Sequence, residues 1–329
     1  MARKVVFHEV GGPDVLRIES VPSPEPGPGE VRIRVKAIGL NRAEIMYRSG
    51  AYVQDPVYPA QLGYEAAGEI DAVGPGVTGF AVGDRVSVIP AFGFSEYGLY
   101  GDLVLAPARA TVKHPASLSL EEAAATWMQY VTVWGALIDI AKLGPGDVVL
   151  LPAASSSVGL AAIQVARRVG ATPIALTRLS AKAAALKEAG AASVIATETQ
   201  DVVAEVMRLT NSKGARVVFD SVGGPAFGKL AEAAAEGGIL FIYGALSPEP
   251  LAMPVLPVLA KHLTIRGYEL FEVTGDDVKI ERVKAFVLEG LLAGAFKPKI
   301  AKTFPFEQIA DAHRYMESNA QVGKVVVTV

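Results

Sequence analysis

The chain of 329 residues contains no cysteine and only four histidines, which limits the chemistry available to it. Without cysteine there are no disulfide bonds, no thiolate ligands for a metal and no thiol nucleophile. A catalytic zinc ion needs three nitrogen, sulfur or carboxylate ligands around an open position. The histidines are scattered and unpaired in the sequence, so each is interpreted as a surface or structural side chain: His8, His114, His262 and His313.

A strong net charge and long apolar runs are also lacking. The formal net charge of −3 at pH 7 gives no electrostatic reason to expect binding to nucleic acid or to an anionic membrane. No apolar run approaches the roughly 20 residues that span a bilayer. Residues 1–7 lack the apolar core of a signal peptide and are typical of a first β-strand. We therefore expect a soluble cytoplasmic protein without nucleic-acid or membrane partners.

Hydrophobic residues make up 51% of the chain, which is enough for two domains. The first 122 residues hold short alternating strands broken by proline- and glycine-rich turns, which is typical of a β-rich domain. From about 146 to 270, near-continuous apolar strands alternate with helices, which indicates a doubly wound parallel sheet of the Rossmann type. The predicted strands of this sheet are residues 147–153, 172–177, 193–196, 215–220, 238–243 and 263–270.

The chain then returns to helices at 276–293 and 306–317 and a last strand at 323–329. We predict a Rossmann domain over 123–270, and a second domain built from 1–122 and 271–329.

The turn after the first Rossmann strand is the most informative segment. Residues 152–159 read Pro-Ala-Ala-Ser-Ser-Ser-Val-Gly, a run of small residues that opens onto a helix. Helix-terminal N–H groups and the helix dipole bind a nucleotide pyrophosphate in this geometry, and small side chains allow the close approach. Ser156 and Ser157 stand where glycines are more usual, and only Gly159 remains. The sequence therefore predicts a dinucleotide site, with an ordinary strand–helix turn as the alternative.

The residues after the second strand indicate which coenzyme is bound. An NAD site carries an acidic residue about 20 residues beyond the glycine turn. Thr177, Arg178 and Lys182 occupy this region, and no carboxylate follows until Glu188. Because arginine pairs with phosphate through a rigid fork, we predict NADPH as the cofactor. The alternative is that the two cations are solvated charges at a helix start.

Several short passages occur in a characteristic order. They are residues 39–44 (Gly-Leu-Asn-Arg-Ala-Glu), 48–52 (Arg-Ser-Gly-Ala-Tyr), 63–68 (Gly-Tyr-Glu-Ala-Ala-Gly), 82–86 (Val-Gly-Asp-Arg-Val), 129–132 (Gln-Tyr-Val-Thr), 219–224 (Phe-Asp-Ser-Val-Gly-Gly) and 323–326 (Gly-Lys-Val-Val). Together they resemble the zinc-free quinone oxidoreductase branch of the medium-chain dehydrogenase/reductase superfamily, over essentially the whole chain. The resemblance implies that the N-terminal domain is GroES-like.

The chain departs from the zinc-dependent members of that superfamily at their metal ligands. Asn41 stands in place of a cysteine, Tyr64 in place of a histidine and Gln129 near a third ligand, while one carboxylate, Glu65, cannot hold zinc alone. The pattern disfavours alcohol oxidation, because nothing polarises and deprotonates an alcohol. What remains is hydride transfer from NADPH to an electron-poor acceptor, a quinone or an α,β-unsaturated carbonyl compound.

The resemblance also implies roles for individual residues. Asn41 is expected near the nicotinamide ribose and acceptor oxygen, with helix capping as the alternative. A phenol can donate to a developing enolate, and Tyr52, Tyr64 or solvent can supply the final proton. The predicted catalytic residues are Asn41, Tyr52 and Tyr64, and the predicted substrate contacts are Tyr47, Tyr52, Tyr64 and Gln129.

Cofactor contacts are expected at the carboxyl ends of the Rossmann strands. Lys324 is expected to reach the cofactor's phosphates, with a surface ion pair as the alternative. The complete predicted set is Asn41, Thr132, Ser156, Ser157, Val158, Thr177, Arg178, Lys182, Val222, Tyr243, Gly244, Ala245 and Lys324.

Residues 263–270 form an apolar edge strand that is hazardous if left open. In similar proteins this edge pairs with its twin, so we predict a homodimer.

Two other functions remain open. An enoyl-thioester reductase needs a basic entrance for a coenzyme or carrier phosphate, for which the candidates are Arg42, Arg48, Arg109 and Lys113. The second open function is that of a sensor or structural module, which binds NADPH without turnover. The acceptor is not fixed by the sequence, because fold-level analogy does not choose a substrate.

Overall fold

The computed structural model describes all 329 residues and divides into two compact units. Unit 1 consists of Met1–Met128, Ile280–Leu292 and Lys297–Val329, and unit 2 of Gln129–Lys279 and Ala293–Phe296. The predicted boundaries, at 122/123 and 270/271, lie six and nine residues before the breaks at 128/129 and 279/280, and residues 293–296, predicted for the other domain, belong to unit 2. No helix is long and apolar enough to cross a bilayer.

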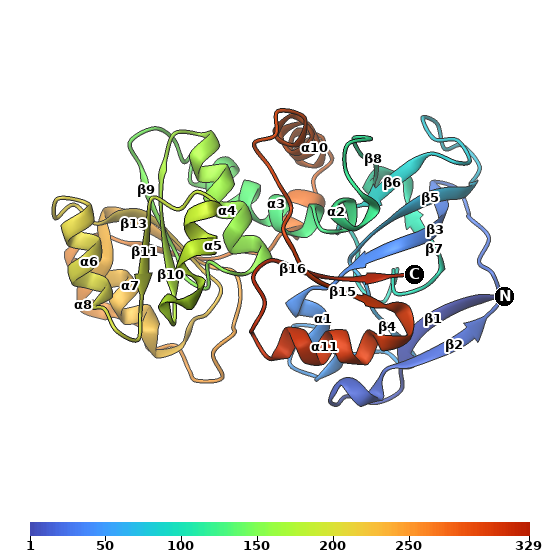
Figure 1. Cartoon of the computed structure of the whole chain (residues 1–329), viewed down its shortest axis with the longest axis horizontal. Coiled ribbons are helices and arrows are strands. Elements are labelled where there is room, and N and C mark those ends of the chain that lie inside the picture. Colours follow the sequence, from blue (N-terminus) through green and yellow to red (C-terminus); the bar gives the residue numbers. More distant parts are fainter. The chain divides into compact units, whose positions relative to one another are not determined.

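Unit 2 contains a six-stranded, all-parallel sheet in the order β11-β10-β9-β12-β13-β14. This order reverses direction beside β9, where doubly wound sheets bind ligands. Helices α4 and α5 lie on one side of the sheet, and α6 and α7 on the other (Figure 1). The strands are β9 (Val148–Leu151), β10 (Thr172–Thr177), β11 (Ser193–Ala196), β12 (Ala215–Asp220), β13 (Ala234–Ile242) and β14 (Thr264–Gly267); the helices are α4 (Ser157–Arg168), α5 (Ala183–Glu188), α6 (Val202–Leu209), α7 (Phe227–Ala233) and α8 (Val255–Ala260).

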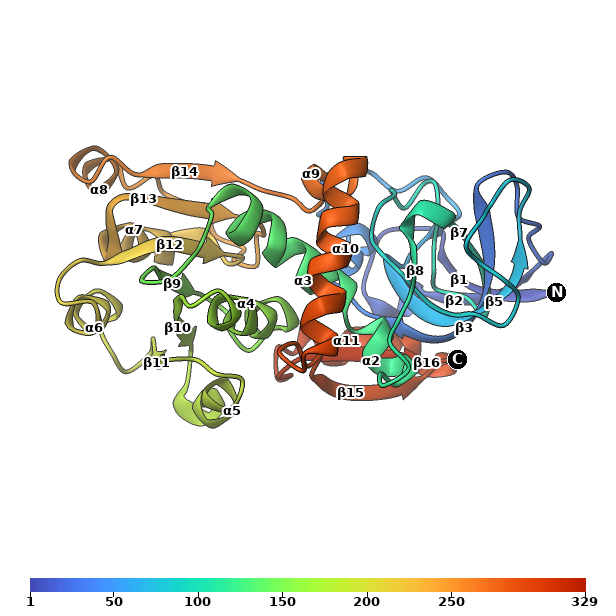
Figure 2. The ribbon, with the colours of Figure 1, turned by 90° about the horizontal axis from the view of Figure 1, so that it is seen from above.

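Burial of one face of this sheet explains its apolar strands. Leu150 of β9, Ile174 of β10 and Val218 of β12 pack with Val206 of α6 and Phe227 of α7 in one core cluster. Strand β14 is at one edge of the sheet (Figure 2) and is shorter than the predicted 263–270, because pairing with β13 ends at Gly267.

Unit 1 holds a seven-stranded sheet in the order β15-β16-β3-β5-β6-β8, with β7 also paired to β3, and a three-stranded sheet β2-β1-β4. The last strand, β16, runs antiparallel to β3, which fixes the C-terminal segment to the N-terminal domain. The strands are β1 (Ala2–Phe7), β2 (Arg17–Val21), β3 (Glu30–Gly39), β4 (Ala60–Gln61), β5 (Glu65–Val73), β6 (Arg85–Val88), β7 (Leu103–Pro107), β8 (Thr111–Lys113), β15 (Ile300–Pro305) and β16 (Lys324–Thr328).

The remaining helices are α1 (Arg42–Arg48), α2 (Leu120–Ala124), α3 (Trp127–Val133), α9 (Phe271–Thr274), α10 (Asp277–Leu292) and α11 (Ile309–Glu317), with a π-helix at Trp134–Ile140. The predicted fold class, a Rossmann sheet combined with a β-rich domain, is confirmed.

Candidate active site

The predicted nucleotide turn joins β9 to α4 in unit 2. Ser156 caps α4, because its Oγ accepts the Gly159 N–H at 3.1 Å. The N–H groups of Ser157 and Val158 fall in the first helical turn, where no intrahelical partner exists. Ala153 has φ = +47°, a left-handed conformation that side chains disfavour. The turn thus presents backbone donors at a helix start, and a phosphate fits this arrangement.

Gly159 allows this helix to pack against the strand end. A Cβ built on Gly159 would lie 2.5 Å from the Ala154 backbone, which is too close for any side chain. We expect Gly159→Ala to lower the free energy of unfolding by about 1–3 kcal/mol, the usual effect of overpacking, as measured by urea unfolding. The matched control is Gly228→Ala in α7, where an added Cβ meets nothing within 4 Å. Equal stability of the two variants would contradict the close packing.

The side chain of Lys182, which follows β10, contacts the nucleotide turn. Its Nζ lies 3.4 Å from Ser155 Oγ, within hydrogen-bonding distance. Burial, and then the charge of Arg178, lower the pKa of Lys182. Two cations therefore lie close together beside the turn, and Thr177, at the end of β10, is 8% exposed. Arg178, Lys182 and Thr177 fit the 2′-phosphate expected of NADPH.

The carboxyl ends of β12 and β13 are tied together by Asp220. This buried carboxylate, which the sequence interpretation did not single out, accepts the N–H groups of Val222 at 2.8 Å and Gly223 at 3.0 Å. Its backbone oxygen accepts the Tyr243 N–H at 3.0 Å. Burial raises the pKa of Asp220. An aspartate that follows an apolar strand and precedes glycines is the sequence signal for such a turn.

The other predicted residues of unit 2 surround these strand ends. Tyr243 is stacked on Phe219, with ring centroids 3.9 Å apart, and burial raises its pKa. A Cβ on Gly244 would lie 2.8 Å from the Ser221 oxygen, so this predicted contact lies at a close backbone approach. Gln129 and Thr132 are buried on α3.

In unit 1, Asn41 lies between β3 and α1. Its backbone N–H donates to Glu44 Oε2 at 2.7 Å, and its Oδ1 accepts from Lys324 Nζ at 2.6 Å. An ammonium only donates, so Lys324 fixes which side of the amide carries the oxygen. Nδ2 donates to the Gly39 oxygen at 3.1 Å and lies 3.4 Å from Glu44 Oε1. The amide donors thus turn inward, and only Oδ1 retains a lone pair for a ligand hydroxyl.

Lys324 is 1% exposed and forms an ion pair with Glu65, which is fully buried. Glu65 Oε2 also accepts the Met128 N–H at 3.0 Å. Because the ammonium is held between Glu65 and Asn41, the structure shows neither a surface ion pair nor an ammonium free to reach phosphates. Lys324 instead orients Asn41.

The three predicted tyrosines come together around Phe94. Tyr64 and Tyr47 lie against its ring, with centroids 3.9 Å and 4.5 Å from it, and both are buried. Tyr52 is half-buried, and its hydroxyl is 3.3 Å from that of Tyr64. Tyr47 and Tyr64 thus both lie in the core of unit 1, and the Tyr52–Tyr64 pair combines a buried and a more accessible phenol.

Glu44 was missed as a functional candidate. It is fully buried, and burial raises its pKa to about 7 although Tyr100 Oη donates to it at 2.6 Å. Its Oε1 accepts the Tyr64 N–H at 3.0 Å. The sequence signal was the Asn-x-x-Glu spacing of 41–44, which is typical of a helix capping box.

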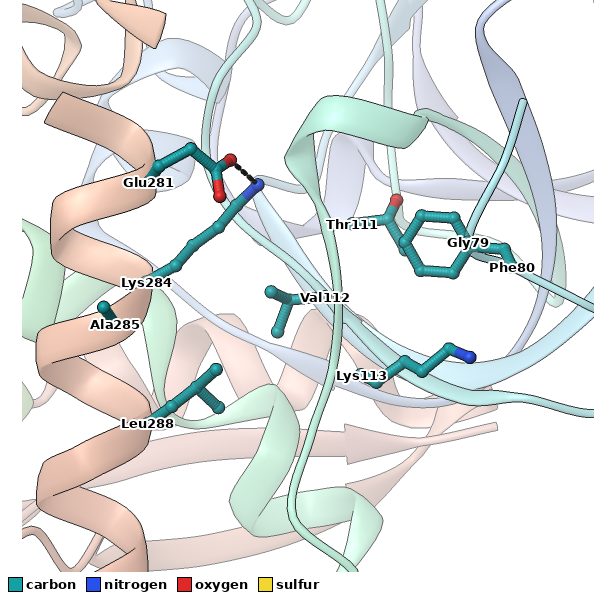
Figure 3. Close-up of a pocket in the computed structure, with 9 residues that line it drawn as sticks. All are labelled: Gly79, Phe80, Thr111, Val112, Lys113, Glu281, Lys284, Ala285 and Leu288. Atoms are coloured by element: carbon teal, nitrogen blue, oxygen red, sulfur yellow. Dashed lines mark hydrogen bonds and ion pairs between the residues drawn. The ribbon is translucent and has the colours of Figure 1, made fainter. Parts of the chain in front are cut away.

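A separate hollow in unit 1, of about 410 Å³, lies between α10 and β8 (Figure 3). Lys113, a candidate for the basic entrance, lines it, but none of the predicted catalytic, substrate-contact or cofactor-contact residues does. Its two lysines are paired, Lys284 with Glu281 at 2.6 Å and Lys113 with Asp84 at 2.8 Å. The candidate residues thus form two groups, Asn41, Tyr52 and Tyr64 in unit 1, and the nucleotide turn and strand ends in unit 2.

Two family models match the chain. Residues 27–116 match the alcohol dehydrogenase GroES-like domain, and residues 157–282 match the zinc-binding dehydrogenase model. Three curated relatives are 33% identical to this protein over 99% of its chain. One is the synaptic vesicle membrane protein VAT-1 homolog of Rattus norvegicus, of which 83% is covered. The other two are the 2-haloacrylate reductase of Burkholderia sp and the quinone oxidoreductase of Pseudomonas aeruginosa, and 99% of each is covered.

Solved structures show the same fold over the full length. One described as an NAD-dependent alcohol dehydrogenase has a TM-score of 0.93 and 35% identity, with 99% of both chains covered. The quinone oxidoreductase of Escherichia coli complexed with NADPH has a TM-score of 0.91 and 28% identity, with 99% of this chain and 100% of that chain covered. The resemblance drawn from the sequence motifs is confirmed: the chain belongs to the quinone oxidoreductase branch of the medium-chain dehydrogenase/reductase superfamily.

Proposed function

We propose that this oxidoreductase uses NADPH to reduce a quinone or an α,β-unsaturated carbonyl compound. The observation that carries the proposal is the position of Lys182 on Ser155, beside Arg178 and next to the helix start at Ser157. Phosphate donors and 2′-phosphate cations are thereby combined in one segment of unit 2. A quinone oxidoreductase with bound NADPH among the similar structures supports this cofactor, whereas the name of another neighbour specifies NAD.

The residues present fit NADPH. Ser157 and Val158 would bind the pyrophosphate through their N–H groups, and Arg178 and Lys182, with Thr177, would bind the 2′-phosphate. When bound, NADPH supplies a hydride. Val222 would adjoin the adenosine, and the nicotinamide half would contact Thr132, Tyr243, Gly244, Ala245 and Asn41.

Unit 1 would supply the polar groups of the reaction. Asn41 Oδ1, oriented by Lys324, would accept a hydrogen bond from a ribose hydroxyl. The phenol of Tyr52 or Tyr64 would donate to the acceptor oxygen as negative charge develops there, which requires no ionised residue. Gln129 would contact the substrate from unit 2.

The proposal is tested by following NADPH absorbance at 340 nm with quinones, enals, enones and crotonyl-CoA. We expect turnover with quinones or enones. Highest turnover with crotonyl-CoA would instead show an enoyl-thioester reductase, and NADPH binding without oxidation of NADPH by any acceptor would show a non-catalytic module.

The enoyl-thioester alternative has less structural support, because three of the four candidates for its basic entrance have partners within unit 1. Arg48 is 1% exposed and pairs with Glu317 inside unit 1. Lys113 pairs with Asp84, and Arg42 donates to Asn319 Oδ1 at 2.6 Å. One solved neighbour, 26% identical, is an enoyl reductase.

We further propose a homodimer through the edge strand β14. This strand pairs only with β13, and the adjacent α8 exposes Leu256 and Leu259 by 77% and 66%. A second copy would cover the open edge and these apolar side chains. We expect size-exclusion chromatography with light scattering to give the mass of two chains at micromolar concentration. The mass of one chain would contradict the proposal.

A further inference from the structure

A line of buried hydrogen bonds in unit 1 runs between α1 and α11, which lie side by side (Figure 1). Arg48 Nη1 lies 2.9 Å from His313 Nδ1, and His313 Nε2 lies 3.2 Å from Tyr100 Oη. Tyr100 Oη then donates to Glu44 Oε2 at 2.6 Å. Arg48 is 1% exposed, and the other three side chains are fully buried. The line therefore lies out of contact with water.

Arg48 fixes the direction of every hydrogen bond in this line. A guanidinium only donates, so His313 Nδ1 must accept and the ring proton must sit on Nε2. Nε2–H then donates to Tyr100, and the Tyr100 hydroxyl proton points to Glu44. Burial and the charge of Arg48 lower the pKa of His313 to about 3, so the ring stays neutral. The line therefore requires an acceptor at its last position.

Glu44 holds the two parts of the candidate site in unit 1. Its Oε2 accepts the Asn41 N–H at 2.7 Å, and its Oε1 accepts the Tyr64 N–H at 3.0 Å. Asn41 precedes α1 and Tyr64 precedes β5, so one carboxylate joins two separate segments. Four donors point at this single group: the backbone N–H groups of Asn41 and Tyr64, Asn41 Nδ2 and the Tyr100 hydroxyl.

A proton on Glu44 disrupts this arrangement. The new O–H would face N–H donors and the Tyr100 hydroxyl, which already accepts from His313 Nε2. If it donated to Tyr100 Oη, the Tyr100 proton would lose Glu44 as its acceptor. Burial raises the pKa of Glu44 to about 7, and the Tyr100, Asn41 and Tyr64 donors together with the charge of Lys324 oppose this shift. The remaining neighbouring charges are Glu65, paired with Lys324, and Glu317, paired with Arg48.

We propose that Glu44 is a positioning residue that holds Asn41 and Tyr64 in place only as a carboxylate, and that Arg48 keeps it an acceptor through His313 and Tyr100. The consequence for catalysis rests on the function proposed above. Above about pH 7, the Glu44 carboxylate binds the N–H groups of both Asn41 and Tyr64. Below about pH 7, Glu44 takes up a proton and one of these two hydrogen bonds is lost.

The direction of the line is tested without any substrate. The full chain is labelled with ¹⁵N-histidine, and the NMR signals of His313 are assigned with the His313→Asn variant. We expect His313 to be the neutral Nε2–H tautomer at pH 7.5. The ¹⁵N chemical shifts of its ring nitrogens are expected to change with a midpoint near pH 7 as Glu44 titrates, although the ring itself does not gain a proton. Tyr100→Phe removes one hydroxyl and should abolish that shift. A protonated ring, or the Nδ1–H tautomer, would overturn the proposal.

Kinetics test the positioning role. We expect kcat/KM for NADPH to decrease when the pH is lowered below about 7. Glu44→Gln should lower kcat/KM about 10- to 100-fold at pH 8 and remove this pH dependence, because a glutamine has only one accepting oxygen. The matched control is Glu122→Gln, which alters a half-buried capping glutamate whose Oε2 accepts the Ser119 N–H at 2.9 Å. This variant should keep the wild-type profile.

The outcomes separate the two proposals. If Glu44→Gln does not fold, Tyr100→Phe serves in its place, and its kcat/KM profile should move to higher pH, because Glu44 loses a donor that lowers its pKa. Unchanged profiles in folded, active variants would overturn the positioning role. The expected histidine shifts in a protein that is inactive with every acceptor would instead contradict the proposed function alone.

Discussion

Alanine at both Arg178 and Lys182 is expected to lower kcat/KM for NADPH by about 100-fold and to leave kcat/KM for NADH nearly unchanged. The two cations are near each other, and Lys182 contacts Ser155 of the nucleotide turn. A hydrogen bond to a charged group contributes about 1.5–3 kcal/mol, and each 1.4 kcal/mol corresponds to a tenfold change in affinity. Because NADH lacks the 2′-phosphate, it does not use these contacts. Initial rates at 340 nm with each coenzyme measure the effect.

The control for this variant is Lys187→Ala, which removes an exposed lysine of α5 whose Nζ bonds the Ala192 oxygen. It should not change the preference between the coenzymes. A wild-type protein that uses NADH better than NADPH would contradict the role of Arg178 and Lys182 and would favour a purely structural interpretation of both cations.

Lys324→Met is expected to lower the free energy of unfolding by about 3–5 kcal/mol, which is the usual cost of removing one partner from a buried ion pair. Glu65 is fully buried and would be left as a charge without its counter-ion. The same change releases Asn41 Oδ1 from the ammonium that orients it. Urea unfolding followed by circular dichroism gives the stability.

Two comparisons make this prediction specific. Lys113→Met removes an exposed lysine paired with Asp84 and should cost only about 0–1 kcal/mol. The double change Lys324→Met with Glu65→Gln removes both charges and should recover part of the loss. If Lys324→Met costs no more than Lys113→Met, the buried pair does not stabilise the fold.

Local patterns were sufficient to predict most of the Rossmann unit. Strand β10 was predicted at 172–177 and occurs there, and the small-residue turn at 152–159 opens onto a helix as predicted, with α4 starting at Ser157. Apolar runs and small-residue turns act over a few neighbouring residues, so the sequence shows them directly. The edge strand β14 was predicted too long, because its end is set by pairing with β13.

The partners of the site residues in unit 1 were not predictable in this way. Lys324 lies 283 residues after Asn41 in the sequence, and His313 lies 213 residues after Tyr100. Such contacts form only when α11 and β16 return to the N-terminal domain. The sequence identified Asn41 and Lys324 as separate candidates, but it showed neither their contact nor the function of Glu44.

Hydride transfer is tested most directly by mass spectrometry of an enone reduced with NADPH that carries deuterium at C4 of the nicotinamide, with each C4 epimer used in turn. We predict that deuterium from one epimer appears at the β-carbon of the product. An unlabelled product with both epimers, or NADPH that is bound but not consumed, would contradict hydride transfer by this protein.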